Sequence, residues 1–300
     1  QDGDGAGLCD GDCDDLDPDR SPFYAEAPGD GIDNNCNGQI DEATSCDCSA
    51  SNEAEAMDLC DALSVSITYY GDSSAHGYRV NNDYGAIDPQ YGCGYAGISS
   101  GLIWDTVPQT GTGLYSTDRN PTGSPFNCFA CTQAGSTLWE HMGPSGCCEN
   151  ETWYDVMAMR MAIEVPHNVQ GFSFDFIFFS AEYPEWVQTS FNDTFYAILQ
   201  TGALTQIQNI SFDINGQPLT VNNGWFETPP SWSQPINGTG YETYGSASGW
   251  LTTTTPCDPG ETMYLTFWIH DEGDHIYDSA VIVDNWRWIA TKVSGPITIK

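Results

Sequence analysis

The stretch from His270 to Asn285, HDEGDHIYDSAVIVDN, sets two histidines and five carboxylates beside a strand-like apolar run. A zinc hydrolase needs histidine ligands on a rigid element, often at i and i+4 on one helix face. His270 and His275 are five residues apart in a glycine-containing segment, which does not favour zinc. Carboxylates on a turn between two strands suit a hard cation better, with a solvent-exposed acidic loop as the alternative. The calcium ligands expected here are Asp271, Asp274 and Asp278.

A second acidic group lies in FFSAEYPEWVQTSFNDTFYAIL, where one predicted strand runs into acids before the next strand begins. If these strands neighbour those that flank 271–278, both loops open at one end of the fold. Glu182 and Asp193 would then share one ion with the first group. Asp284 lies inside an apolar strand and is costly to bury unpaired, so we expect it to meet a cation, Arg287 or backbone N–H groups.

Near the N-terminus, DNNCNGQIDEA spaces oxygen ligands at alternate positions before a glycine, as EF-hand-type calcium loops do. The twelfth position is Thr44 instead of Glu, so an acid nearer the glycine must close the site. The ligands expected are Asp33, Asn35, Asn37, the Gln39 carbonyl, Asp41 and Glu42.

The first residues, DGDGAGLCDGDCDDLDPD, form a denser acidic run. Crowded carboxylates would have raised pKa values and oppose folding unless divalent cations lay between them. A disordered acidic tail is the alternative, but interleaved glycines and cysteines at 9, 13 and 36 speak against it. The calcium ligands expected in this run are Asp2, Asp4, Asp10, Asp12, Asp14 and Asp15.

Catalytic interpretations are weaker. GISSG matches the serine-nucleophile pattern around Ser99, but a strand-like run ending at Pro108 follows it, where the pattern needs a helix. Paired acids could hydrolyse glycosides, yet a carboxylate that holds calcium is not available as an acid. Four cysteines at 128, 131, 147 and 148 could bind zinc, but disulfides are favoured in an oxidising compartment. We therefore expect no enzyme.

Three tryptophans lie in a Gly/Pro/Ser/Thr-rich region, NNGWFETPPSWSQPINGTGYETYGSASGW. Aromatic rings stack on sugars, form hot spots in protein contacts, or fill a core beneath long loops, and these three roles stay open. The residues are Trp225, Trp232 and Trp250.

The composition sets limits on partners and location. With 42 Asp and Glu against seven Lys and Arg, the net charge of −35 disfavours nucleic acid and anionic membranes. Residues 1–48 carry twelve Asp and two Glu against Arg20 alone, which indicates local cation binding. Twelve cysteines predict an oxidising compartment, no run approaches the ~20 apolar residues of a membrane helix, and the start at Gln1 fits removal of a signal peptide. We expect a secreted or cell-surface protein.

The elements that position these residues are mostly strands. A helix is predicted around 52–64, capped by Ser51. Strands are predicted at 64–70, 96–104, 158–165, 171–179, 193–199, 207–214, 262–269 and 279–290. This pattern predicts a mainly β protein, a jelly-roll-like β-sandwich with one short helix and a disulfide-tied N-terminal segment.

The domain boundaries expected are an acidic calcium-binding segment at 1–48, the sandwich at 49–290 and a C-terminal tail at 291–300. The Gly/Pro/Thr-rich middle, 104–152, is expected to be held by disulfides. The tail alternates Val293, Ile297 and Ile299, so it is either a linker or a strand that adds to a neighbour's sheet.

Two resemblances extend this interpretation. DGDG, DCDD and DGIDNNCNGQIDE resemble, in order, the metal-binding motif of MopE-type bacterial surface proteins, which implies calcium binding and a Cys13–Cys36 bridge. Cys9 is an addition to that pattern. The resemblance to MopE-type proteins also suggests copper as the bound metal, but the histidines of this chain are scattered and form no cluster with methionine. SAEYPEWV, FNDTF and DEGDHIYDSAVIVDN, together with GISSG, resemble the choice-of-anchor L domain over about 51–290, which implies an extracellular β-rich module of no known catalytic activity.

The sequence thus predicts a non-catalytic, calcium-stabilised surface or matrix protein. Its partners would be further copies of itself in an extracellular polymer, or a cell-surface glycan or protein. A carbohydrate-binding module is the competing interpretation.

Overall fold

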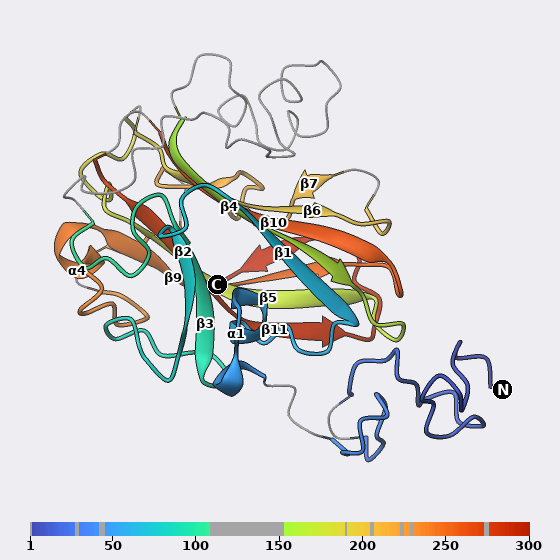
Figure 1. Cartoon of the computed structure of the whole chain (residues 1–300). Helices are drawn as coiled ribbons and strands as arrows, with labels where there is room; N and C mark the ends of the chain where they lie inside the picture. Colours follow the sequence, from blue (N-terminus) through green and yellow to red (C-terminus); the bar gives the residue numbers. More distant parts are fainter. Residues whose placement is uncertain are drawn as a thin grey trace.

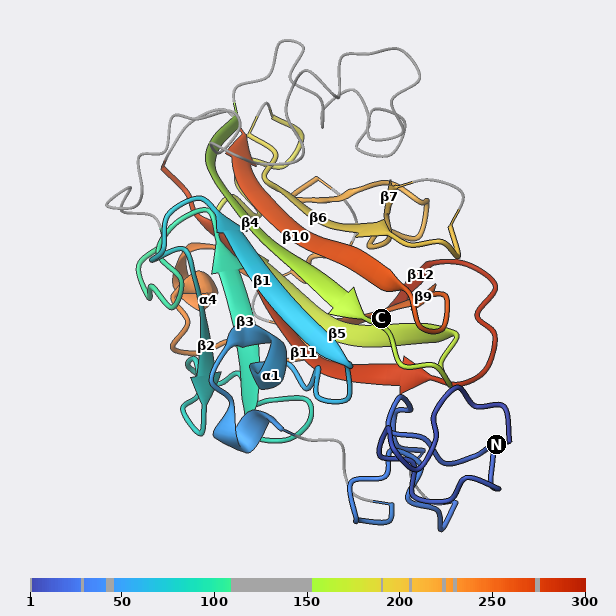
Figure 2. The ribbon, with the colours of Figure 1, turned by 45° about the vertical axis from the view of Figure 1, so that its right-hand side comes forward.

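The computed structural model describes residues 2–27, 30–41, 46–108, 153–189, 191–204, 207–222, 225–228, 231–272 and 276–300. Within these ranges two antiparallel β-sheets pack face to face, as Figures 1 and 2 show. The predicted β-sandwich is confirmed.

The first sheet has the order β1-β4-β10-β6-β7, with β8 also paired to β6. Its strands are β1 (Ser64–Tyr70), β4 (Trp153–Glu164), β6 (Thr194–Gln200), β7 (Gln208–Asn209), β8 (Leu219–Thr220) and β10 (Thr262–Glu272). The second sheet has the order β12-β9-β5-β11-β3-β2. Its strands are β2 (His76–Val80), β3 (Gly94–Ser99), β5 (Gly171–Ser180), β9 (Ser246–Pro256), β11 (Ser279–Ile289) and β12 (Ile297–Ile299).

The chain crosses between the sheets repeatedly, as β4-β5-β6 and again as β9-β10-β11, which is a jelly-roll-like connection. The core lies between the sheets. Alternate residues of β5 and β10 face it, including Phe174 and Phe267, whose rings meet edge to face at 5.2 Å. The other face of β5, with Ile177 and Phe179, is buried in a second apolar cluster under loops.

The predicted helix at 52–64 is wrong in length and in its cap. α1 covers only Glu53–Ala56, and Asn52 rather than Ser51 is the N-cap, accepting a hydrogen bond from the Glu55 backbone N–H. The helix ends early because Asp58 has a left-handed φ of 67° and Cys60 is bonded to Cys46. Two other short elements are η1 (Asp47–Ser49) and α4 (Tyr241–Tyr244). No helix among the described residues is long and apolar enough to cross a membrane.

Several strand predictions also need correction. The strand predicted at 96–104 ends at Ser99, and the one at 207–214 reduces to the two residues of β7. β2, β8 and β9 were not predicted; in β9, Gly, Ser and Thr dominate the run SASGWLTTTTP. The tail was expected to be a linker or a strand that adds to a neighbour's sheet; instead Ile297–Ile299 form β12, which pairs with Thr252–Thr254 of β9 in the chain's own sheet.

The N-terminal segment, residues 2–41, has neither helix nor strand where it is described and lies below the right-hand ends of β5 and β11 in both views (Figures 1 and 2). It contacts the sandwich through Asn168, whose side chain accepts from the Ala25 N–H and donates to the Ala25 carbonyl. Ala25 is buried in the main core cluster. A Cys13–Cys36 disulfide ties the segment internally, and Cys48–Cys93 ties the following residues to β3.

Candidate metal centre

Strands of both sheets end at one end of the sandwich and bring acidic side chains together. We call the buried acids there the acidic cluster; its members are Asp155, Glu182, Asp193, Asp271 and Asp278. They come from the start of β4, the residues after β5, the residue before β6, the end of β10 and the residue before β11. The prediction that the loops around 182–193 and 271–278 open at one end is confirmed, because Asp193 bonds to residues of both.

Asp193 is fully buried at the centre of the acidic cluster. Its Oδ2 accepts a hydrogen bond from the Ser279 hydroxyl at 2.6 Å, and its Oδ1 accepts one from the Glu272 N–H at 3.1 Å. The Asp193 N–H donates to the Glu182 carboxylate. These bonds fix the carboxylate between the two sheets.

Asp271 is 2% exposed, and neither of its carboxylate oxygens has a hydrogen-bond partner among the residues that the structure describes. A register shift in the pairing of β10 with β4, between Ile269 and Asp271, sets this residue out of the regular alternation. A buried, unpartnered carboxylate is costly, so it calls for a proton or a cation.

The electrostatics point the same way. Burial raises the pKa of Asp193 to about 7 and that of Asp278 to about 8. Burial, with the charges of Asp193 and Asp278, also raises the pKa of Asp271 well above its ordinary value. Among the described residues, no Lys or Arg forms an ion pair with Asp193, Asp271 or Asp278. A divalent cation among these oxygens would supply the missing charge.

Gly101 closes the site from the β3 side. A Cβ at this position would lie 2.1 Å from Asp278 Oδ2, so only glycine leaves room for the carboxylate. Ser100 Oγ accepts a hydrogen bond from the Ser279 N–H, and Ser99 Oγ donates one to the Ser279 carbonyl. The GISSG motif therefore packs against the acidic cluster, and Ser99 is a buried structural hydroxyl.

Two acids near Asp278 escaped the sequence analysis. Asp155 and Asp105 both add negative charge that raises its pKa. Asp155 stands in the largely apolar run YDVMAM with a left-handed φ of 50°, and a carboxylate in such a strand is the signal that could have found it. Asp105, in a loop, offers no comparable signal.

The zinc interpretation of the opening stretch gains no support from His270. Its Nδ1 accepts a hydrogen bond from Trp268 Nε1, and burial lowers its pKa to about 3, so it stays neutral inside the fold. Asp274 and His275 lie outside the described residues. Asp284 accepts hydrogen bonds from the backbone N–H groups of Gln90 and Tyr91, one of the three outcomes expected.

The N-terminal acids form a second group. Carboxylate oxygens of Asp2, Asp4 and Asp12 lie within 4.8 Å of one another. In each residue Oδ1 accepts a backbone N–H two residues onward, while Oδ2 is buried without a hydrogen-bond partner in the described part of the chain. The Oδ1 atoms thus shape the turn and leave Oδ2 atoms for a cation. Asp10, Asp14 and Asp15 are not part of this group.

The EF-hand-like residues lie in turns of their own. Asp33 accepts the N–H groups of Asn37 and Gly38, and Asn35 and Asn37 each accept an N–H two residues on. Asp41 accepts the Gly31 N–H. The calcium site predicted from these residues and the Gln39 carbonyl stays a prediction, and Glu42 lies outside the described ranges.

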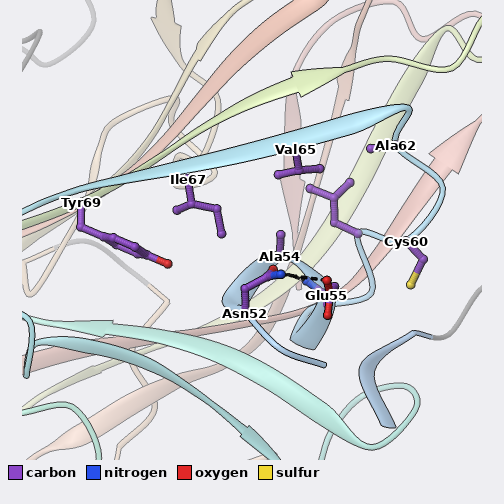
Figure 3. Close-up of a pocket in the computed structure, with 9 residues that line it drawn as sticks. Asn52, Ala54, Glu55, Cys60, Ala62, Val65, Ile67 and Tyr69 are labelled. Carbon is purple, nitrogen blue, oxygen red and sulfur yellow. Dashed lines mark hydrogen bonds between the residues drawn. The ribbon is translucent and has the colours of Figure 1, made fainter. Parts of the chain in front are cut away.

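Figure 3 shows a hollow of about 460 Å³ between α1 and β1. Apolar side chains of β1, including Val65 and Ile67, point into it. Its polar residues Asn52 and Glu55 bond to each other as the helix cap, so they are committed to structure. The hollow lies along β1, the edge strand of the first sheet, and none of its lining residues forms a pair of acid and base or of nucleophile and base.

The three tryptophans are half-buried packing residues. Trp225 packs against the main core, and Trp232 and Trp250 pack against the second apolar cluster. Trp232 Nε1 also donates to Ser246 Oγ. None presents a fully exposed ring to a ligand.

Comparison with known proteins gives two family matches. Residues 149–286 match the choice-of-anchor L domain, and residues 12–42 match the MopE-type metal-binding motif. No curated protein sequence matches the chain. Among solved structures, TmCBM61 in complex with beta-1,4-galactotriose is similar with a TM-score of 0.30 and 7% identity, over 80% of this chain and 99% of that one. The first match contains all five members of the acidic cluster.

Proposed function

With a choice-of-anchor L domain matched at 149–286 and a MopE-type metal-binding motif matched at 12–42 as the premise, we propose that the chain is a non-catalytic secreted or cell-surface protein stabilised by Ca²⁺. One ion would bind the acidic cluster and join the two sheets. Another would bind Asp2, Asp4 and Asp12 and order the N-terminal segment.

Asp271 carries this proposal. Its two oxygens are buried without a hydrogen bond from any described residue, beside the buried carboxylates of Asp193 and Asp278. Three such groups cannot all be ionised without a counter-charge. A divalent cation would resolve the conflict. The carboxylates would have to draw closer around it, since no three of the described acids of the cluster have oxygens within 4.8 Å of one another.

The chemistry of the donors supports calcium over zinc or copper. The described acids at both sites offer oxygen ligands, which hard cations such as Ca²⁺ take, whereas zinc and copper favour imidazole and thiolate. Cys13 and Cys36 are bonded to each other and are not available as thiolates.

A structural role follows from the same contacts. Carboxylates that hold an ion cannot act as general acid or base, and the Ser99 hydroxyl is bonded to a carbonyl inside the fold. The ion would act by fixing strand ends that otherwise repel one another. Such a module suits an extracellular medium, where millimolar calcium occupies sites of modest affinity.

The experiment is a melting curve of the purified chain in millimolar CaCl₂ and in EGTA. We expect a clear rise in Tm with calcium for the wild type, and a much smaller rise for Asp271→Asn. A wild-type Tm that does not change between the two buffers would refute structural calcium.

Assembly with further copies is the finer part of the proposal. Among the described strands β1 pairs only with β4, so its outer edge and the neighbouring hollow could receive a strand from another copy. Assembly through the edge of β1 would leave β12 paired with β9 in the chain's own sheet. Light scattering in calcium should then detect oligomers that Ile67→Glu reduces to monomers, while a monomeric wild type at high concentration would exclude assembly.

A further inference from the structure

A second hollow, of about 320 Å³, is lined in part by Tyr183, the residue that directly follows Glu182 of the acidic cluster. It is lined by Tyr183, Pro184, Glu185, Thr228, Glu242, Thr243, Tyr244 and Gly245. One wall is the segment after β5, and the other is α4 with the residue that follows it.

The lining has the chemistry of a sugar site. Tyrosine rings offer apolar faces for the C–H face of a pyranose, and carboxylates and hydroxyls accept or donate hydrogen bonds to its hydroxyls. The Tyr183 ring is held by stacking on Phe226, with centroids 5.1 Å apart and planes 19° apart. Its orientation is therefore fixed before a ligand arrives, which lowers the entropy lost on binding.

The two walls are rigidly joined. Glu242 accepts the N–H groups of Gly238 and Gly240 at 2.8 Å, which fixes the turn before α4. A Cβ on Gly245 would lie 2.0 Å from the Ser180 carbonyl oxygen, so the end of α4 lies directly against the end of β5. Two residues beyond Ser180 is Glu182, a member of the acidic cluster.

The charge of the hollow selects among glycans. Glu185 is exposed and Glu242 is half-buried at this surface, on a chain whose net charge is −35. Uronate or sulfate groups would be repelled, while a neutral sugar carries no charge for these carboxylates to repel.

We propose that the hollow between Tyr183 and Tyr244 binds a neutral oligosaccharide and that Ca²⁺ at the acidic cluster holds its Tyr183 wall in place. The calcium half rests on the function proposed above. The sugar half rests on the lining residues alone.

The test is affinity electrophoresis in CaCl₂ through gels that contain neutral galactan, xylan, mannan or β-glucan, with alginate as the acidic comparison. We expect retardation by at least one neutral polymer and none by alginate. Tyr244→Ala should weaken retardation about tenfold, with an unchanged calcium-induced rise in Tm. Tyr78→Ala, which changes an exposed tyrosine on β2, is the matched control and should bind as the wild type does.

Each outcome decides one half. Absence of retardation by every neutral polymer, or a Tyr244→Ala chain that binds like the wild type, would overturn the sugar site and leave the calcium site untouched. Binding that persists in EGTA and in Asp271→Asn would overturn the calcium linkage and leave the sugar site standing. Retardation by alginate alone would overturn the choice of a neutral ligand.

Discussion

Replacement of Asp278 by Asn should have opposite effects on stability with and without calcium. Burial, followed by the charges of Asp193, Asp105 and Asp155, raises the pKa of this carboxyl from 3.8 to about 8. Without a cation the folded chain must therefore protonate it at pH 7, whereas the unfolded chain leaves it ionised. Asparagine has nearly the same shape and no charge, so it avoids that step.

The size of the effect follows from the shift. To protonate at pH 7 a carboxyl whose ordinary pKa is 3.8 costs about 4 kcal/mol, which is the upper limit of the gain in EGTA. Relaxation and redistribution of charge among neighbouring acids reduce it, so we expect roughly 1–3 kcal/mol. In saturating calcium the wild type gains about 2.7 kcal/mol at a hundred times Kd. The variant loses a charged ligand and most of that gain.

The assay is urea denaturation of the wild type and Asp278→Asn in EGTA and in 10 mM CaCl₂. We expect the variant to be more stable in EGTA and less stable in calcium. Asp88→Asn makes the same charge change at an exposed acid and should behave alike in both buffers. A change of the same sign in both buffers for Asp278→Asn would refute the reasoning, because it would separate the carboxylate from the cation.

Three further predictions follow from the contacts. The pKa values of the cluster acids are raised in the folded state, so the folded metal-free chain binds more protons than the unfolded chain, and its stability should fall as pH rises from about 4 to 8. Calcium should flatten this dependence of stability on pH. A stability that does not change with pH in EGTA would show that these acids do not have raised pKa values. Gly101→Ala puts a Cβ 2.1 Å from an Asp278 oxygen and should weaken calcium binding, measured by calorimetry, about tenfold or more. The control Gly295→Ala, whose Cβ would have nothing within 4 Å, should leave the affinity unchanged. Equal calcium affinities of the two variants would show that the cluster tolerates displacement of Asp278. Joint replacement of Cys13 and Cys36 by Ser removes a cross-link over 23 residues, which is worth about 3 kcal/mol. The N-terminal segment should then be cleaved by protease, while the Tm of the sandwich stays the same. An N-terminal segment as resistant to protease as in the wild type would mean that the disulfide is dispensable.

Much of the fold was accessible from the sequence because two-residue alternation is strong in the central strands. The run 171–179 forms β5 with one residue added. In β10 the alternate residues Met263, Leu265, Phe267 and Ile269 lie on the core side, as their two-residue spacing predicts. The strand β9 was missed because threonine and serine make up much of it, and those residue types are equally common in loops.

The site was accessible only in part, for a similar reason. Glu182, Asp193, Asp271 and Asp278 flank strong strand signals, so their convergence followed from the expected antiparallel pairing. Asp155 and Gly101 join them from β4 and from beyond β3, and no spacing along the chain links those positions to the others. The early end of α1 also depends on a disulfide partner and a left-handed residue that periodicity does not encode.

The central claim is that a calcium ion binds the acidic cluster. The most direct test counts bound Ca²⁺ per chain by equilibrium dialysis of the wild type, Asp271→Asn and Asp12→Asn, the last a change confined to the N-terminal group. We predict that each variant loses one ion relative to the wild type, and that only Asp271→Asn also loses the calcium-dependent stability of the sandwich. An Asp271→Asn chain that binds as many ions as the wild type, with the same affinity, would contradict the account.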